Sequence, residues 1–161
     1  MKILAIDPGT ERSAWLIYDS DKEIIEQKGI YKNDEILLLP QRYCYDELVI
    51  EMVACYGMPV GKTVFETCVW IGRFYEGLRQ YYCHLVYRKD VKMYLCNSMR
   101  AKDSNIRQAL IDRFGPGREK AIGTKRTPGP LYGIKKDIWS ALALAVTYAS
   151  KYEELNEALN E

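Results

Sequence analysis

The chain has 161 residues, 48% of them hydrophobic, and a formal net charge of +1 at pH 7. This length fits one domain with a sizeable core, and the near-neutral charge gives no global sign of a nucleic-acid partner. The five cysteines are odd in number and include no C-x-x-C pair, which argues against a disulfide framework or a zinc site. His84 is the single histidine, which excludes multi-histidine metal sites. No signal peptide precedes Met1 and no apolar run could span a bilayer, so we expect a cytoplasmic protein.

The chain opens with a short apolar segment that ends on an acid. Residues 3–6 are too few for a helix and predict a strand buried on both faces. The apolar run stops at Asp7, after which Pro8-Gly9 predicts a sharp turn. An acid held at the end of a buried strand is either a turn cap or part of a metal site, because a buried unpaired charge is costly.

A sheet and its first helix follow. Residues 14–18 and 23–30 are apolar or alternating segments at short spacing, and they predict an antiparallel meander with the first strand. Residues 33–45 predict a helix that Pro40 could break. These segments place the N-terminal third of the chain in one sheet.

Residues 47–53 repeat the opening pattern, since this apolar strand is interrupted by one acid, Glu51. A helix-to-strand connection places this strand parallel to the first and beside it, so Asp7 and Glu51 could meet at adjacent strand ends. The second half then predicts a helix from Thr63 to about Tyr82, a strand at 84–87, and helices at 88–99 and 103–114. Residues 117–136 predict a mobile basic loop. A last helix begins near Ile134 and includes Asp137.

Three acids therefore lie on elements that this fold brings together: Asp7, Glu51 and Asp137. Three carboxylates close together repel one another, and in dry surroundings the repulsion is costly unless a cation compensates it. Oxygen ligands select a hard ion, so Mg²⁺ is the expected partner, with Mn²⁺ as a substitute. Two such ions would assist phosphodiester cleavage by activating water and stabilising the leaving oxygen. The alternative is that each acid is a helix or turn cap or a surface charge.

At these residues the chain resembles the RuvC Holliday-junction resolvases of the ribonuclease H-like superfamily, and within them the phage-encoded relatives. The resemblance is carried by Ile6-Asp7-Pro8-Gly9, by Val49-Ile50-Glu51 and by Asp137 through Tyr148. It implies an α/β, ribonuclease H-like fold with a five-stranded mixed sheet flanked by helices. It also implies a homodimer that makes paired nicks in four-way DNA junctions, in a bacterial host cell if the chain is phage-encoded.

The resemblance implies that Asp7, Glu51 and Asp137 are the catalytic, metal-binding acids. The family typically places a second acid three residues into the last helix, where this chain has Ser140, so the number of metal ions is in doubt. Candidate phosphate contacts are Lys102, which falls where the family often has a lysine near the DNA, and Lys125, Arg126, Lys135 and Lys136.

The alternative for these cations is a solvated basic loop. Tyr56 or Tyr132 could stack on an unpaired base, although core packing is the simpler expectation for both.

The main functional hypothesis is thus a Mg²⁺-dependent, structure-selective DNA endonuclease that hydrolyses branched DNA without a covalent enzyme intermediate. A second hypothesis is a junction-binding scaffold protein that does not cleave, because the fourth acid is missing. A third is an actin-like or sugar-kinase-like nucleotide-binding protein, because Asp7-Pro8-Gly9-Thr10 also resembles the phosphate loop of that superfamily. The chain is short for such a protein and has no second phosphate loop.

Overall fold

The computed structural model describes residues 1–79 and 82–160. Its strands form one five-stranded sheet in the order β3-β2-β1-β4-β5, antiparallel across β1, β2 and β3 and parallel across β1, β4 and β5. This confirms the predicted mixed sheet. The strands are β1 (Lys2–Asp7), β2 (Arg12–Asp19), β3 (Ile24–Lys32), β4 (Glu47–Met52) and β5 (Cys83–Tyr87).

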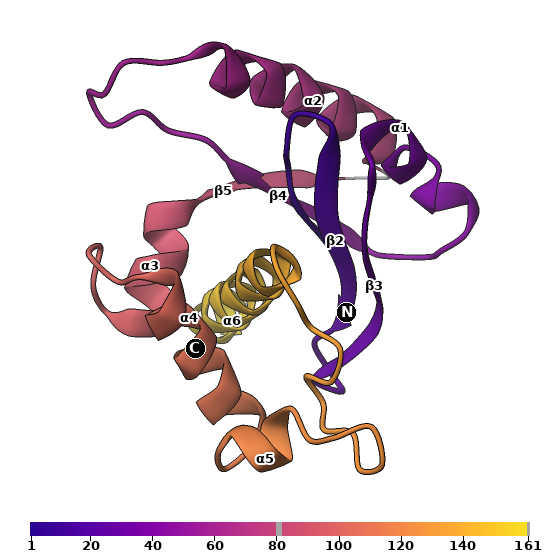
Figure 1. Cartoon of the computed structure of the whole chain (residues 1–161), viewed down its shortest axis with the longest axis vertical. Coiled ribbons are helices and arrows are strands. Elements are labelled where there is room, and N and C mark those ends of the chain that lie inside the picture. The colour runs from indigo at the N-terminus through magenta and orange to yellow at the C-terminus, as the bar shows by residue number, and fades with distance from the viewer. Residues whose placement is uncertain (80–81, 161) are drawn as a thin grey trace.

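Helices cover both faces of the sheet (Figure 1). One face carries α1 (Asn33–Ile36), a 3₁₀ turn (Leu39–Gln41) and α2 (Lys62–Leu78), and the other carries α3 (Arg88–Cys96), α4 (Asp103–Phe114), α5 (Arg118–Ala121) and α6 (Ile138–Asn160). Within residues 1–79 and 82–160, none of the helices combines the length and the apolar character needed to cross a lipid bilayer.

The core has two layers because side chains on a strand alternate between the faces. On β1, Ile3 and Ala5 pack beneath α6, whereas Leu4 and Ile6 pack beneath α2, and all of them are fully buried. Residues 141–146 of α6 are also fully buried, and their alternating alanines allow this helix to approach β1 and β2 closely. Each buried leucine contributes roughly 1.5–3 kcal/mol, so α6 is the main anchor of this face.

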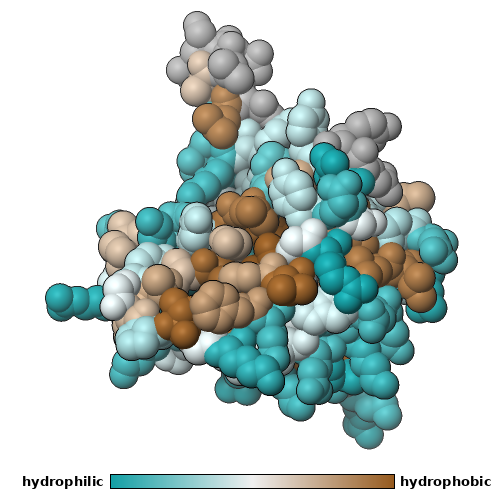
Figure 2. Space-filling model, turned by 90° about the horizontal axis from the view of Figure 1, so that it is seen from above, coloured by the Kyte–Doolittle hydropathy of each residue, from teal (hydrophilic) through white to brown (hydrophobic). Residues whose placement is uncertain are grey.

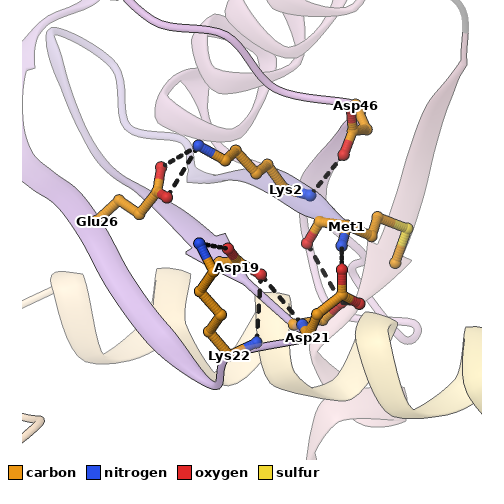
Figure 3. Close-up of polar contacts among 8 residues, drawn as sticks. Met1, Lys2, Asp19, Asp21, Lys22, Glu26 and Asp46 are labelled. Carbon is orange, nitrogen blue, oxygen red and sulfur yellow. Dashed lines mark hydrogen bonds and ion pairs between the residues drawn. The ribbon is translucent and has the colours of Figure 1, made fainter.

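The N-terminal end of β1 is fixed by ion pairs and hydrogen bonds (Figure 3). The amino group of Met1 pairs with Asp21, and the Lys2 ammonium lies 2.9 Å from Glu26. The backbone N–H of Lys2 donates to Asp46 at 2.7 Å. These contacts tie β1 to the β2–β3 connection, to β3 and to the start of β4, at the end of the strand opposite to Asp7.

Two predicted helices have different bounds in the structure. The helix expected over residues 33–45 is a single turn, Asn33–Ile36, followed by a 3₁₀ turn that contains Pro40, because proline cannot continue the hydrogen bonds of a longer helix. The helix expected to end near Tyr82 ends at Leu78 in the described chain. Gln80 and Tyr81 lie outside the described residues.

The basic segment over residues 117–136 is folded, although its sequence predicted a mobile loop. It contains α5, and the N–H of Leu131 donates to the carbonyl of Ala121 at 2.8 Å. The N–H of Gly129 donates to the carbonyl of Ile122 at 3.0 Å. Ala121 and Leu131 are fully buried against the α6 face. The buried side chains of Ala121 and Leu131, together with local backbone hydrogen bonds, thus order a segment whose apolar residues follow no regular helix or strand spacing.

We predict that Gly129→Ala loosens this segment. A Cβ atom at position 129 would lie 2.3 Å from the carbonyl oxygen of Lys120, so the free energy of unfolding should fall by about 1–3 kcal/mol. Trypsin should also cut faster at Lys125 and Arg126. Gly72→Ala is the matched control, because a Cβ there has no neighbour within 4 Å. Equal trypsin rates for the two variants would contradict this account of the segment.

Candidate active site

Two of the predicted acids lie side by side at the carboxyl ends of two neighbouring strands inside the sheet, β1 and β4. β1 and β4 run parallel with Ile6 opposite Ile50, so Asp7 and Glu51 take the next position at the same end of each strand. The residues two positions before each acid belong to the core beneath α6. Because side chains alternate, both carboxylates point to the α6 face.

The third predicted acid, Asp137, immediately precedes α6. The helix begins at Ile138, four residues later than predicted, and Lys136 adopts a left-handed conformation with φ 49°. The carbonyl of Asp137 accepts the N–H of Ser140 at 3.0 Å and that of Ala141 at 3.2 Å, so Asp137 is the residue that starts the helix. Its exposed carboxylate lies at the helix N-terminus, where the helix dipole favours a negative charge.

The three acids influence one another electrostatically. Burial, followed by the charges of Glu51 and Asp137, raises the pKa of Asp7 from its ordinary 3.8 to about 7, against the opposing effects of Arg88 and the Ser140 hydroxyl. Burial also raises the pKa of Glu51, and Arg88 opposes this shift. The charges of Glu51 and Asp137 therefore act on Asp7, and the positive charge of Arg88 does not fully offset them.

Sequence reasoning missed the cation of this site, Arg88. Its Nη1 lies 3.3 Å from Oε2 of Glu51, and its Nη2 lies 2.6 Å from Oδ1 of Asp103. The sequence carried no signal for it, because its place follows from the register of the folded sheet, in which β5 pairs in parallel with β4 and Tyr87 lies opposite Met52. Arg88, which follows Tyr87, therefore lies at the same end of the sheet as Glu51.

The donor set fits a hard divalent ion in its chemistry, since it consists of carboxylate oxygens around a partly buried acid, Asp7, whose pKa is raised by the charges of Glu51 and Asp137. A closed ligand set is not formed, because no three His, Cys, Asp or Glu side chains within residues 1–79 and 82–160 are arranged to hold an ion. Glu51 is instead engaged by Arg88. The assignment of Asp7, Glu51 and Asp137 as metal ligands stays a prediction.

Two of the predicted phosphate contacts lie beside Asp137. A cavity of about 700 Å³ lies between the β2–β3 ribbon and the segment before α6, and its lining includes Lys135, Lys136, Asp137, Arg12 and Lys28. Lys136 and Asp137 also line a second cavity, of about 370 Å³, together with Ser140 and Arg88. Positive charge therefore flanks Asp137.

The other predicted contacts lie elsewhere. Lys102 is exposed and caps α4 through its backbone N–H, which donates to Asn105 at 2.9 Å. Lys125 and Arg126 are exposed on the loop after α5, and neither lines the two cavities that contain Asp137.

Trp139 borders the site, and the two tyrosines singled out in the sequence lie at the protein surface. Tyr56 and Tyr132, for which core packing was the simpler expectation, are both exposed. The guanidinium of Arg107 lies 4.7 Å from the ring centre of Trp139, and this pair, which the sequence did not reveal, lines the smaller cavity.

The turn after Asp7 is occupied by the hydrogen bonds of the protein itself. The N–H of Gly9 donates to the Ser13 hydroxyl at 3.0 Å, and the carbonyl of Gly9 accepts from the Asn33 side chain at 2.9 Å. A phosphate-binding loop presents such amides to its ligand. The geometry therefore gives no support to the nucleotide-binding hypothesis.

Solved structures share this fold. No protein-family model and no curated protein matches the chain. The Thermus thermophilus RuvC structure is 14% identical, with a TM-score of 0.61, and the alignment covers 92% of this chain and 93% of that one. T. thermophilus RuvC in complex with a Holliday junction substrate is 15% identical over the same shares, with a TM-score of 0.64.

A further match is a ROK family protein from Streptococcus pneumoniae TIGR4 in complex with sucrose, 17% identical. The alignment covers 58% of this chain and 37% of that one, and its TM-score of 0.39 is too low to support an inference. The RuvC structures confirm the predicted fold: this chain has the ribonuclease H-like architecture of RuvC over almost its whole length.

We predict that Asp7→Asn stabilises the metal-free protein at alkaline pH. Because the folded-state pKa of Asp7 is about 7 and that of the unfolded chain is near 3.8, the wild-type free energy of unfolding should fall as pH rises between these values. At pH 8 in EDTA the variant should be more stable by roughly 1–3 kcal/mol, and near pH 4 the difference should vanish.

Urea unfolding across this pH range measures the difference. Asp34→Asn is the control, because Asp34 is exposed and pairs only with Arg73 at 3.3 Å among the described residues. An Asp7→Asn variant that is less stable than wild type at pH 8 would show that the carboxylate is not destabilising.

Proposed function

We propose that this protein is a Mg²⁺-dependent, structure-selective DNA endonuclease that nicks four-way junctions or other branched DNA. The observation that carries the proposal is the placement of Asp7 and Glu51 on adjacent strand ends, close enough to Asp137 for both charges to raise the pKa of Asp7. The shared fold with RuvC over 92% of the chain supports the same function.

The residues of the site suit hydrolysis of a phosphodiester. When bound, Mg²⁺ supplies positive charge at the scissile phosphate and lowers the pKa of a water. Asp7 and Glu51 lie at the ends of rigid strands and would hold the ion in a fixed position. Lys135 and Lys136 bind the DNA backbone beside Asp137 and orient it without reading base sequence. No step requires a nucleophilic side chain.

We predict that Asp7→Asn, Glu51→Gln and Asp137→Asn each lower the cleavage rate by at least about 10²-fold, because each removes a charge that the metal needs. Binding of the junction should persist, since the backbone contacts remain. The measurement compares labelled four-way junctions, Y-branches and plain duplexes, with Mg²⁺ and with Mn²⁺. Asp34→Asn is the control and should cleave as wild type does. Cleavage by the wild type in excess EDTA would contradict the metal mechanism.

A non-cleaving branched-DNA scaffold is the second candidate. It is favoured by Ser140, which stands where a fourth acid would complete the site, and by the lack of a closed ligand set within residues 1–79 and 82–160. A gel-shift assay run beside the nicking assay separates the two functions. Tight junction binding without product in Mn²⁺ would favour the scaffold.

We further propose that the protein acts as a homodimer joined through α2. Phe65 and Val69, one helical turn apart, expose 62% and 63% of their surface, and Gly72 continues this stripe. Leu85 is exposed on the same face of the sheet, at its open edge. Figure 2, which looks onto the α2 face, shows a band of hydrophobic side chains running across it. A two-fold dimer would present two sites to the two strands of a symmetric junction.

We predict that Val69→Asp converts the dimer to a monomer and strongly reduces paired nicking, because each interface would bury two carboxylates. Light scattering coupled to size exclusion measures the mass. Gln41→Asp makes the same charge change at an exposed position outside α2 and should leave the dimer intact. A wild-type protein that is monomeric at working concentrations would contradict the proposal.

A further inference from the structure

Arg107 of α4 lies over the ring of Trp139, in the first turn of α6. Its guanidinium carbon is 4.7 Å from the ring centre, which is within the range of a cation–π contact. Both residues line the cavity of about 370 Å³ that also contains Asp137. Because Trp139 packs against the buried residues beneath α6, the ring holds the guanidinium in a fixed place at the wall of this cavity.

The guanidinium of Arg107 is not neutralised by an acid. In the part of the chain that the structure describes, the arginine ion pairs involve Arg73, Arg79, Arg88 and Arg113. Arg73 is the informative comparison, because it also lies over a tryptophan, Trp70, at 4.0 Å, but pairs with Asp34 at 3.3 Å. Arg107 has the same aromatic support without the acid, so its N–H donors remain available to an anion.

Arg107 and Lys136 are the cations of this cavity that no acid engages among the described residues. The third cation of the lining, Arg88, is engaged by Glu51 at 3.3 Å and, more closely, by Asp103 at 2.6 Å. The lysine ion pairs of residues 1–79 and 82–160 involve Lys2, Lys22 and Lys62. Two uncommitted cations therefore remain in the wall of the cavity.

The cavity beside Arg107 meets a second basic cavity at Asp137. The cavity of about 700 Å³ on the side of the β2–β3 ribbon shares Lys136 and Asp137 with it, and its lining adds Lys28 and Lys135. Asp137 therefore has uncommitted positive charge on two sides, from the ribbon and from α4. A DNA strand that passes Asp137 can be held by its phosphates on both sides.

We propose that Arg107, supported by Trp139, binds a DNA phosphate on the α4 side of Asp137, so that one strand runs from the β2–β3 ribbon across Asp137 to α4. This inference rests on the branched-DNA substrate of the proposed function and adds the path of the strand to it. It does not depend on the metal. Trp139 is a positioning residue, because it acts on the phosphate through the guanidinium.

A purely structural cation–π pair would behave differently from a phosphate contact. If the pair only fastened α4 to α6, Arg107→Gln would lower the free energy of unfolding and leave the salt dependence of DNA binding unchanged. If the ring of Trp139 stacked on a base instead, Trp139→Leu would weaken binding and Arg107→Gln would not. A phosphate contact changes the salt dependence, because each neutralised phosphate releases counterions.

The first test measures binding of a labelled four-way junction in EDTA at several salt concentrations. Arg107→Gln should weaken binding roughly tenfold at 0.1 M salt and should reduce the slope of log K against log salt concentration by about 0.9, the value for one phosphate. Arg107→Lys keeps the charge and should retain the slope. Arg42→Gln is the matched control, because Arg42 is exposed after the 3₁₀ turn on the opposite face of the sheet; it should bind as wild type.

A second measurement locates the contact on the DNA. Single uncharged methylphosphonates replace the phosphates around the branch point one at a time, and binding is again measured in EDTA. The wild type should lose affinity at a phosphate to which Arg107→Gln is indifferent, because the contact is already absent in that variant. Lys135→Gln should be indifferent to a different phosphate of the same strand, since Lys135 lines the cavity on the ribbon side.

An unchanged salt slope in a folded Arg107→Gln variant would overturn the inference. So would indifference of the Arg107 and Lys135 variants to one and the same phosphate, or to phosphates on different strands. These results leave the proposed nuclease function intact. Arg107→Met, which keeps an unbranched side chain over the indole, replaces Arg107→Gln if that variant does not fold. A wild type that binds no junction at low salt would instead contradict the proposed function, and the inference with it.

Discussion

The partial burial of Asp7 beside Glu51 is the constraint on which the candidate site depends. Parallel pairing of β1 with β4 puts the two acids at the same strand end and on the same face. A shift of either strand by one residue would turn its core side chains to the wrong face, so the register cannot relax the repulsion. The fold thereby holds like charges side by side in partly buried positions, and the pKa of Asp7 rises to about 7.

Contacts elsewhere in the molecule offset the repulsion between Asp7 and Glu51. The fully buried half of α6 anchors one face of the sheet, and the ion pairs around Lys2 and Met1 fix the opposite end of β1. Charge at the candidate site is balanced locally by Arg88, which is itself held by Asp103. The stabilising contacts and the candidate site therefore lie at opposite ends of one strand, β1.

Much of this arrangement could be predicted from the sequence. The apolar runs before Asp7 and Glu51 are short and end in an acid, which is enough to place both at strand ends, and the alanine-rich stretch after Asp137 predicts a helix packed on the sheet. Arg88 could not be recognised, because its role depends on the register between β4 and β5 and on a contact with Asp103. The folded state of residues 117–136 was also not predicted, because two isolated buried residues, Ala121 and Leu131, produce no regular apolar spacing in the sequence.

Anomalous diffraction from crystals grown with Mn²⁺ near pH 8 is the most direct test of the central electrostatic claim. The account predicts a strong manganese peak at the carboxyl ends of β1 and β4, roughly 2.0–2.3 Å from oxygens of Asp7 and Glu51 and facing Asp137. A map with ordered side chains at this edge and no manganese between them would contradict it, because the crowded acids would then be tolerated without a cation.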